Sequence, residues 1–193
     1  MNYREVKKLN LGCGENKKEG YINVDWNNLV NPDVIHDLNV YPYSFKDETF
    51  DLIEADHVLE HLDKPFLAMI ECHRLLKPGG KLFIKVPHFS RGFTHAEHSH
   101  GFDVTFPLYF NKKFTKSGFF GVEFELIRIH LNWFSFFHLL PAMSYGPTSI
   151  FLLHLINKII SGLANLNRGF CSRIWCYWVG GFDEIEIEFV RPK

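Results

Sequence analysis

The early part of the chain carries a glycine-rich turn and two acidic residues that suit a bound nucleoside. Residues 9–14 read LNLGCG, and Gly12 and Gly14 permit a tight turn whose backbone N–H groups can approach a ligand closely. Asp25 can accept hydrogen bonds from both hydroxyls of a ribose, and Asp37 can accept one from an exocyclic amine such as that of adenine. These residues together predict a nucleoside site.

The same turn argues against a dinucleotide site. A fingerprint for a pyrophosphate needs a third small residue at the position that Lys17 occupies. The sequence therefore offers no grip for phosphates and disfavours a nicotinamide-dependent oxidoreductase.

A second group of candidates lies in the histidine-rich stretch PHFSRGFTHAEHSHGFD, which follows the fifth expected strand. A neutral imidazole there could take the proton from an acceptor hydroxyl, which makes His100 and His88 candidate catalytic residues. Alternatively, a divalent metal could be held by His95, His98 and His100 with Asp103 or Glu97. A solvated polar loop is the third interpretation. The irregular spacing specifies no coordination geometry, so we assign no metal ligand.

Short apolar runs that alternate with turns and a helix predict the elements that position these residues. The pattern is typical of a parallel sheet wound with helices, which binds ligands beyond the carboxyl ends of its strands. A helix should begin at Pro65 and stop at the Pro78-Gly79-Gly80 sequence, and residues 87–111 should form a long loop. The expected strands cover residues 8–11, 21–25, 33–36, 50–55 and 81–86.

The carboxyl-terminal part predicts two antiparallel strands separated by an inserted cap. The apolar positions of residues 122–133 change parity near Leu126, which indicates a bulge, and residues 184–189 alternate Glu with Ile or Phe. Paired antiparallel, these strands would bring Arg128 and His130 opposite glutamates. Residues 134–181 are too many for a plain connection, and we expect their aromatic side chains to enclose an acceptor or form a subunit contact: Phe136, Phe137, Trp175 and Trp178.

These motifs together resemble the class I S-adenosylmethionine-dependent methyltransferases, and among them the small type 11 methyltransferase domains. The resemblance rests on LNLGCG, NVD, HDLN, FDLIEADHVLEHL and LLKPGGKLFIKVP, which follow one another in the family's order over residues 8–88. It implies S-adenosylmethionine as cofactor and a Rossmann-like α/β fold, with a mostly parallel seven-stranded sheet whose last strand is antiparallel. We expect one methyltransferase domain over residues 1–193, with a core of 1–133 and 182–193 and a helical, aromatic cap at 134–181.

The resemblance also implies roles for single residues. The positions expected to bind the cofactor are Gly12, Cys13, Gly14, Asp25, Trp26, Asp37, Leu38, Ala55 and Asp56. The EHSH sequence at residues 97–100 is similar to a loop of related short methyltransferases, which favours His100 as the base facing the cofactor's methyl group. Only ten residues separate Gly14 from Asp25, so the helix that usually follows the glycine turn must be very short or absent.

Composition limits the remaining choices. The chain has 193 residues, of which 46% are hydrophobic and 22% charged, and its net charge of -1 gives no sign of a duplex nucleic-acid binder. Four scattered cysteines and an amino terminus without an apolar run predict a reduced, cytoplasmic protein. Residues 150–163 form an apolar face that could lie on a membrane, cover a pocket or bind a second copy, whereas Pro141, Gly146 and Pro147 interrupt a membrane span.

The sequence thus predicts an S-adenosylmethionine-dependent methyltransferase. Its expected acceptor is a small molecule or a saccharide or glycolipid-like compound, which we expect it to methylate at an oxygen. The expected partners are that acceptor, a membrane surface or lipid-linked substrate, and a second copy in a homodimer, with no nucleic acid. The alternative is a non-catalytic cofactor-binding or scaffold protein that docks a partner or a membrane through its apolar cap.

Overall fold

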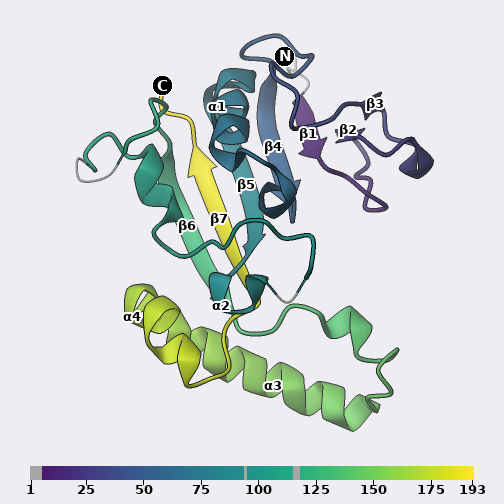
Figure 1. Ribbon diagram of the computed structural model, residues 1–193, viewed down its shortest axis with the longest axis vertical. Coiled ribbons are helices and arrows are strands. Elements are labelled where there is room, and N and C mark those ends of the chain that lie inside the picture. The colour runs from purple at the N-terminus through teal and green to yellow at the C-terminus, as the bar shows by residue number, and fades with distance from the viewer. Residues whose placement is uncertain (1–5, 94, 115–117) are drawn as a thin grey trace, which may run out of the picture.

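The computed structural model describes residues 6–93, 95–114 and 118–193. A seven-stranded sheet in the order β3-β2-β1-β4-β5-β7-β6 runs through its centre (Figure 1). The strands are β1 (Lys8–Leu11), β2 (Ile22–Asp25), β3 (Val34–Ile35), β4 (Phe50–Asp56), β5 (Leu76–Pro87), β6 (Glu125–Asn132) and β7 (Glu184–Val190).

The first five strands pair in parallel, and β7 runs antiparallel to both of its neighbours, β5 and β6. Its residue Ile187 lies opposite Ile84 on one side and Ile129 on the other, so the apolar positions of three strands share one register. The ladder of β6 shifts by one residue between Leu126 and Arg128. The predicted mixed sheet, its antiparallel last strand and the bulge near Leu126 are confirmed.

Helix α1 (Pro65–Leu75) begins as predicted and packs its buried side chains against the sheet, among them Met69 and Leu75. Its end differs from the prediction. Leu76 is already extended and starts β5, so Pro78, Gly79 and Gly80 lie inside that strand. The pairing with β4 jumps from Leu76 to Lys81, and Gly79, at φ +80°, allows the intervening residues to bulge out of the ladder.

The connection from β1 to β2 contains no helix in residues 12–21, all of which the structure describes. A polar network takes the place of the helix. Asn10 donates through Nδ2 to Asn23 Oδ1 at 3.0 Å, and the same oxygen accepts the backbone N–H of Lys18 at 2.8 Å. The two asparagines are 2% and 5% exposed, so these hydrogen bonds satisfy polar groups that would otherwise be buried without partners.

Short helical segments occupy the loops. The region expected as a plain loop at 87–111 contains α2 (Phe89–Gly92) and a 3-10 helix, η3 (Phe106–Phe110). Aromatic burial explains the difference, because Phe102, Phe106 and Phe110 are all at most 5% exposed and pull this region into the core. Two further 3-10 turns, η1 (Asn28–Val30) and η2 (Leu59–His61), follow β2 and β4.

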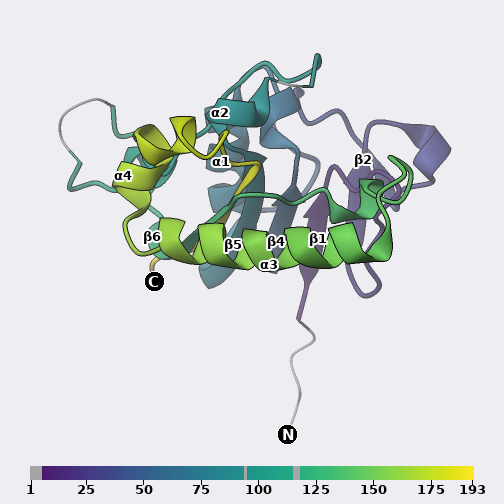
Figure 2. The same ribbon diagram turned by 90° about the horizontal axis from the view of Figure 1, so that it is seen from below.

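The cap consists of η4 (Phe137–Leu139), α3 (Pro147–Ala164), α4 (Arg168–Arg173) and η5 (Trp175–Tyr177). Figure 2 shows α3 crossing the carboxyl edge of the sheet from the β6 side toward β1. One polar stripe of the helix attaches it to the end of β6. Asn157 accepts the backbone N–H of Phe134, and Asn165 bonds both the N–H and the C=O of Leu131.

We expect the Asn165→Ala substitution to lower the free energy of unfolding by about 1–3 kcal/mol, because it leaves the N–H and C=O of Leu131 without their partner. The matched control is Leu166→Ala, a neighbour that is 83% exposed and should change stability by less than about 0.5 kcal/mol. Urea unfolding of both variants measures the difference. Equal losses in the two variants would contradict this account of how the cap is held.

Candidate functional site

The turn between β1 and β2 is held by the carboxylate of Asp25. Gly14 donates its backbone N–H to Oδ2 at 2.8 Å, and Asn27 donates its own to Oδ1 at 2.9 Å. Gly12 and Gly14 have φ angles of +60° and +47°, in the left-handed region that favours glycine. A Cβ atom on Gly12 would lie 2.5 Å from Val58 Cγ2, so the close approach of the segment after β4 also requires this glycine.

A cavity of 490 Å³ lies beyond the ends of β1, β2 and β4, within the range of small-molecule sites. Five residues that the resemblance assigned to the cofactor line it together: Gly12, Asp25, Trp26, Asp37 and Leu38. Trp26 is 73% exposed, so its ring is free to cover a flat ligand. The cavity is completed by Asn39, His57, Val58, His61, Leu62 and Glu97.

A second pocket of 370 Å³ adjoins this cavity and shares Gly12 and His57 with it. It is lined by Cys13, Gly14 and Asp56 from the predicted set. Ala55, the remaining member of that set, is 2% exposed and lines neither space.

The charges of the two spaces differ. Asp25, Asp37 and Glu97 line the first cavity, and no Lys or Arg does so in the part of the chain that the structure describes. His57 also lines it, but both of its ring nitrogens are bonded to carboxylates, those of Glu60 and Glu184. The second pocket carries both signs, on Lys18, Lys85, Asp56 and Glu184. The first cavity therefore suits a cationic ligand without phosphates, and the second suits a zwitterion such as an amino acid.

His57 follows β4 directly and bonds to η2 and β7 at the boundary between the two pockets. Its Nδ1 lies 3.1 Å from Glu60 Oε1, and its Nε2 lies 2.9 Å from Glu184 Oε2 on β7. Burial alone would lower the pKa of His57, but the bonds to Glu184 and Glu60 outweigh it and raise that pKa to about 10. Burial opposes ionisation of Glu184, but hydrogen bonds from His57 and Asn132 bring its pKa below the ordinary value. His57 is therefore a cation at neutral pH.

The sequence pattern did not identify His57 or Glu184 as a site residue. The two are 127 positions apart, and no local pattern links them. One signal was available. β7 runs antiparallel, so its first residue, Glu184, must lie at the carboxyl ends of the parallel strands, where ligands bind.

Part of the histidine-rich loop reaches the rim of the first cavity. The ring of His61 lies 4.8 Å from that of His98 and 6.0 Å from that of His95, measured between centroids. Ser99 donates its backbone N–H to the carbonyl of Glu60 at 2.9 Å, which ties the loop to η2. His61 and Glu97 line the cavity itself.

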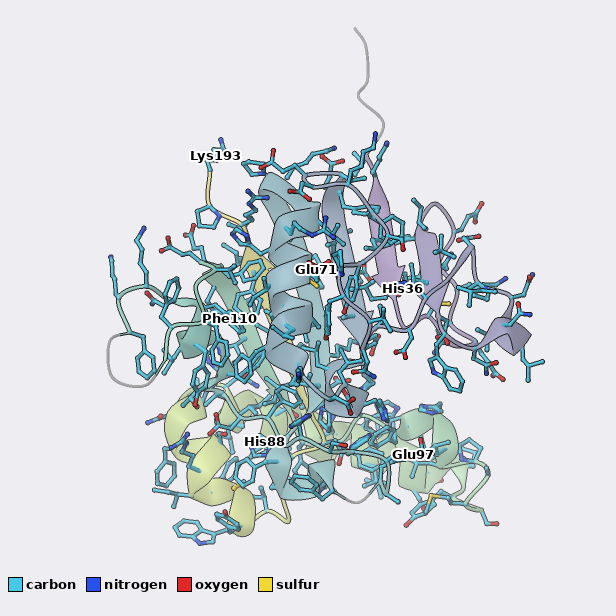
Figure 3. The ribbon with its side chains drawn as sticks, turned by 45° about the horizontal axis from the view of Figure 1, so that its top comes forward. His36, Glu71, His88, Glu97, Phe110 and Lys193 are labelled. Atoms are coloured by element: carbon cyan, nitrogen blue, oxygen red, sulfur yellow. The ribbon has the colours of Figure 1, made fainter. Side chains whose placement is uncertain are left out.

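His88, expected as a catalytic residue, is a core histidine instead. Its side chain is fully buried, with Nδ1 at 2.7 Å from Ser90 Oγ and Nε2 at 2.8 Å from Ser172 Oγ. Burial is the main reason that its pKa falls to about 4. Figure 3 shows it apart from Glu97, which lines the cavity. The sequence placed His88 correctly at the end of β5. Helix α4 of the cap covers this end, and its Ser172 bonds to the His88 ring.

His100, expected as the base that faces the cofactor's methyl group, lines neither of the two spaces at the strand ends. It lines a different pocket together with Phe66 and Arg173, and its Nε2 atom is buried without a partner in the described part of the chain. The reason is the burial of Phe102, whose carbonyl accepts the backbone N–H of Phe89 at 2.8 Å. This anchor draws the end of the loop toward the core and carries His100 with it.

Of the four cap aromatics expected to enclose an acceptor or form a subunit contact, Phe136 reaches the site. It lines the second pocket, and its ring centroid lies 6.3 Å from that of His57. The other three lie elsewhere: Phe137 stacks on His154, Trp175 packs beside Phe182, and Trp178 is 73% exposed.

Comparisons with known proteins agree with this geometry. Residues 9–84 match a family model described as a methyltransferase domain. An uncharacterized methyltransferase of Schizosaccharomyces pombe is 40% identical over 47 residues, which cover 24% of this chain and 17% of that protein. A highly reducing polyketide synthase of Aspergillus sclerotiorum is 32% identical over 85 residues, which cover 43% of this chain and 3% of the synthase. The chain thus spans less than a fifth of the length of these curated relatives.

Solved structures resemble the chain over nearly its whole length. A protein of Galdieria sulphuraria proposed to be a sarcosine dimethylglycine methyltransferase has a TM-score of 0.61 and 16% identity, and the match covers 98% of this chain and 78% of that one. A SAM-dependent methyltransferase of Archaeoglobus fulgidus has a TM-score of 0.58 and 18% identity, with 96% and 86% covered.

The family implies S-adenosylmethionine as the cofactor, which agrees with a cavity that prefers a cation and a pocket that suits an amino acid. The family resemblance inferred from the sequence motifs is confirmed for residues 9–84. Residues 9–84 therefore match the methyltransferase-domain family, and the chain has the fold of solved S-adenosylmethionine-dependent methyltransferases.

Proposed function

We propose that this protein transfers the methyl group of S-adenosylmethionine to an oxygen of a lipid-linked acceptor, such as a saccharide on a membrane lipid. The observation that supports S-adenosylmethionine as the methyl donor is the acidic cavity at the strand ends. Asp25 and Asp37 line this cavity, and no Lys or Arg among the described residues does so. A diphosphate would be repelled there, whereas a sulfonium nucleoside would be attracted.

The two spaces would hold different parts of the cofactor, the nucleoside in the first cavity and the amino-acid end in the second pocket. Asp25 uses one lone pair on each oxygen for the turn, so each oxygen retains capacity to accept a ribose hydroxyl. Asp37 and Trp26 would hold the polar edge and the face of an adenine. Lys18 and Asp56, in the second pocket, would meet the carboxylate and the amine of the amino-acid end.

When bound, the cofactor supplies an activated methyl group on a sulfonium with a good leaving group. What remains for the protein is to align the acceptor oxygen and exclude water, which can contribute about 7–11 kcal/mol to lowering the barrier. His57 is positively charged and bonded at both nitrogens, so it positions Glu60 and Glu184 and does not accept a proton.

The cap supports the proposal that the acceptor is linked to a lipid. The exposed face of α3 carries Phe151, Leu155 and Ile159, which are 69%, 49% and 55% exposed. Residues 134–181 contain no Asp or Glu, although the whole chain has 22, and they contain Lys158, Arg168 and Arg173. An apolar helix with only basic charges around it suits the surface of an anionic bilayer.

By length and composition α3 is a candidate membrane span, with a mean hydropathy of 1.3 and 11% of its residues buried. Its hydrogen bonds to the end of β6 hold it along the domain, which favours a helix that lies on a membrane over one that crosses it. Phe136 and His138, just before this helix, line the second pocket. A lipid-linked acceptor would therefore reach the cofactor along the cap.

We expect Asp25→Asn to weaken the binding of S-adenosylmethionine at least tenfold, because it removes a negative charge and one acceptor oxygen from the cavity. Isothermal titration calorimetry measures the affinity, and circular dichroism checks the fold. Glu19→Gln is the matched control, since Glu19 is exposed and outside both pockets, and its affinity should equal that of the wild type. An unchanged affinity of Asp25→Asn would exclude this role for the carboxylate.

The membrane contact can be tested by sedimentation with vesicles. The wild type should bind vesicles of phosphatidylcholine with about 30% phosphatidylglycerol and bind pure phosphatidylcholine weakly. The double variant Phe151→Ser, Leu155→Ser should bind at least about tenfold more weakly, because two exposed apolar side chains are lost. Leu29→Ser, at a residue that is 92% exposed in η1 and outside the cap, should bind like the wild type.

Two results would contradict the lipid proposal. One is equal vesicle binding by the double variant and the control. The other is a wild-type dimer that the double variant dissociates, with no vesicle binding by either, since the face would then bind a second copy. Cofactor binding without methyl transfer to any saccharide or lipid acceptor would favour the non-catalytic scaffold.

A further inference from the structure

Three side chains at the rim of the acidic cavity form a cluster to which the proposed function assigns no contact with the cofactor. Glu60, His61 and His98 each offer one ligand atom, and these atoms lie within 4.8 Å of one another. They come from two segments, η2 and the loop after α2, which the bond from Ser99 N–H to the Glu60 carbonyl holds together. Tertiary contacts therefore fix the cluster in place.

The carboxylate of Glu60 is incompletely satisfied. Its side chain is fully buried, and Oε1 lies 3.1 Å from His57 Nδ1. The second oxygen, Oε2, is buried and has no hydrogen-bond partner in the described part of the chain. A buried carboxylate oxygen without a partner is unfavourable, and a cation would relieve it.

His98 is oriented as a metal ligand is. Its Nδ1 is bonded to the backbone carbonyl of Gly92 and must therefore carry the proton, which leaves the lone pair on Nε2. Metal-binding histidines are held in this way by a backbone carbonyl on the other nitrogen. The ring of His61 stands edge-on to that of His98, at 77°.

A second cluster, Asp56, His57 and Glu184, contains two carboxylates and a single histidine. Both nitrogens of His57 are already bonded to carboxylates, one to Glu60 and the other to Glu184. That cluster is an internal ion pair and has no imidazole nitrogen to offer.

We propose that Glu60, His61 and His98 bind a divalent transition metal such as Zn²⁺ at the rim of the cofactor cavity. Two imidazoles and one carboxylate are ligands that Zn²⁺ accepts, whereas Mg²⁺ and Ca²⁺ prefer all-oxygen sites. Three protein ligands leave at least one coordination position for a water or a substrate oxygen. This set differs from the sequence-based alternative, because His100 faces another pocket and His98 pairs with η2 instead.

The position of the cluster gives the metal a role that rests on the proposed function. His61 lines the cofactor cavity, so a hydroxyl bound at the open position lies at the mouth of that cavity. The metal lowers the pKa of this hydroxyl, and its proton goes to solvent. The oxygen then forms the new C–O bond while the methyl–sulfur bond breaks, and the sulfur leaves as a neutral thioether. Neither His88 nor His100 is then needed as a base.

Metal binding should be measured directly on the full, untagged chain after removal of metals with a chelator. Titration with Co²⁺, followed by its visible absorption, and calorimetry with Zn²⁺ should both show one equivalent bound. His98→Ala and His61→Ala should each weaken binding at least tenfold. His36→Ala, at a histidine near β3 outside the cluster, should bind like the wild type.

Binding of S-adenosylmethionine and methyl transfer are measured separately on the same samples. No stoichiometric metal on the wild type, or equal binding by the two variants, overturns the metal site; cofactor binding and transfer in that sample leave the proposed function standing. One equivalent of metal that both histidine variants lose supports the site even where no methyl transfer is found, and in that case it is the proposed function that fails.

Discussion

The carboxylate of Asp25 connects the ends of β1 and β2, and the geometry of the whole site depends on it. It accepts the backbone N–H groups of Gly14 and Asn27, which would otherwise lack partners at a nearly buried strand end. The glycine turn is thereby held open beside the cavity. An Asn side chain at this position could accept one of the two hydrogen bonds but would carry no charge. The negative charge of Asp25 is part of what makes the cavity favourable for a cation.

The short connection after β1 has consequences for the rest of the chain. With no helix between Gly14 and Asp25, the asparagine pair Asn10 and Asn23 closes the sheet edge with hydrogen bonds, and little remains there to cover a substrate. The cap takes that position from the other end of the chain, with α3 along the carboxyl edge of the sheet (Figure 2). The domain thus combines an acidic cavity at the strand ends with a cap whose residues 134–181 contain no Asp or Glu.

The sequence predicted the features that local pattern controls. LNLGCG, Asp25 and Asp37 follow directly from strand ends, and the alternation in residues 184–189 identified the antiparallel strand. Features that depend on distant contacts could not be found in this way. His88 and His100 were placed after the correct strand, but burial of Phe102 and the cap decided where they point. His57 and Glu184 meet only because β7 returns between β5 and β6.

The central claim is that the cavity at the ends of β1, β2 and β4 selects a sulfonium nucleoside by charge. A calorimetric titration of the wild-type protein with S-adenosylmethionine and, in a matched experiment, with NAD⁺ tests it most directly. The account predicts one equivalent of S-adenosylmethionine bound, with NAD⁺ at least about a hundredfold weaker because its diphosphate meets Asp25, Asp37 and Glu97. Binding of NAD⁺ as tightly as S-adenosylmethionine, or binding of neither, would contradict it.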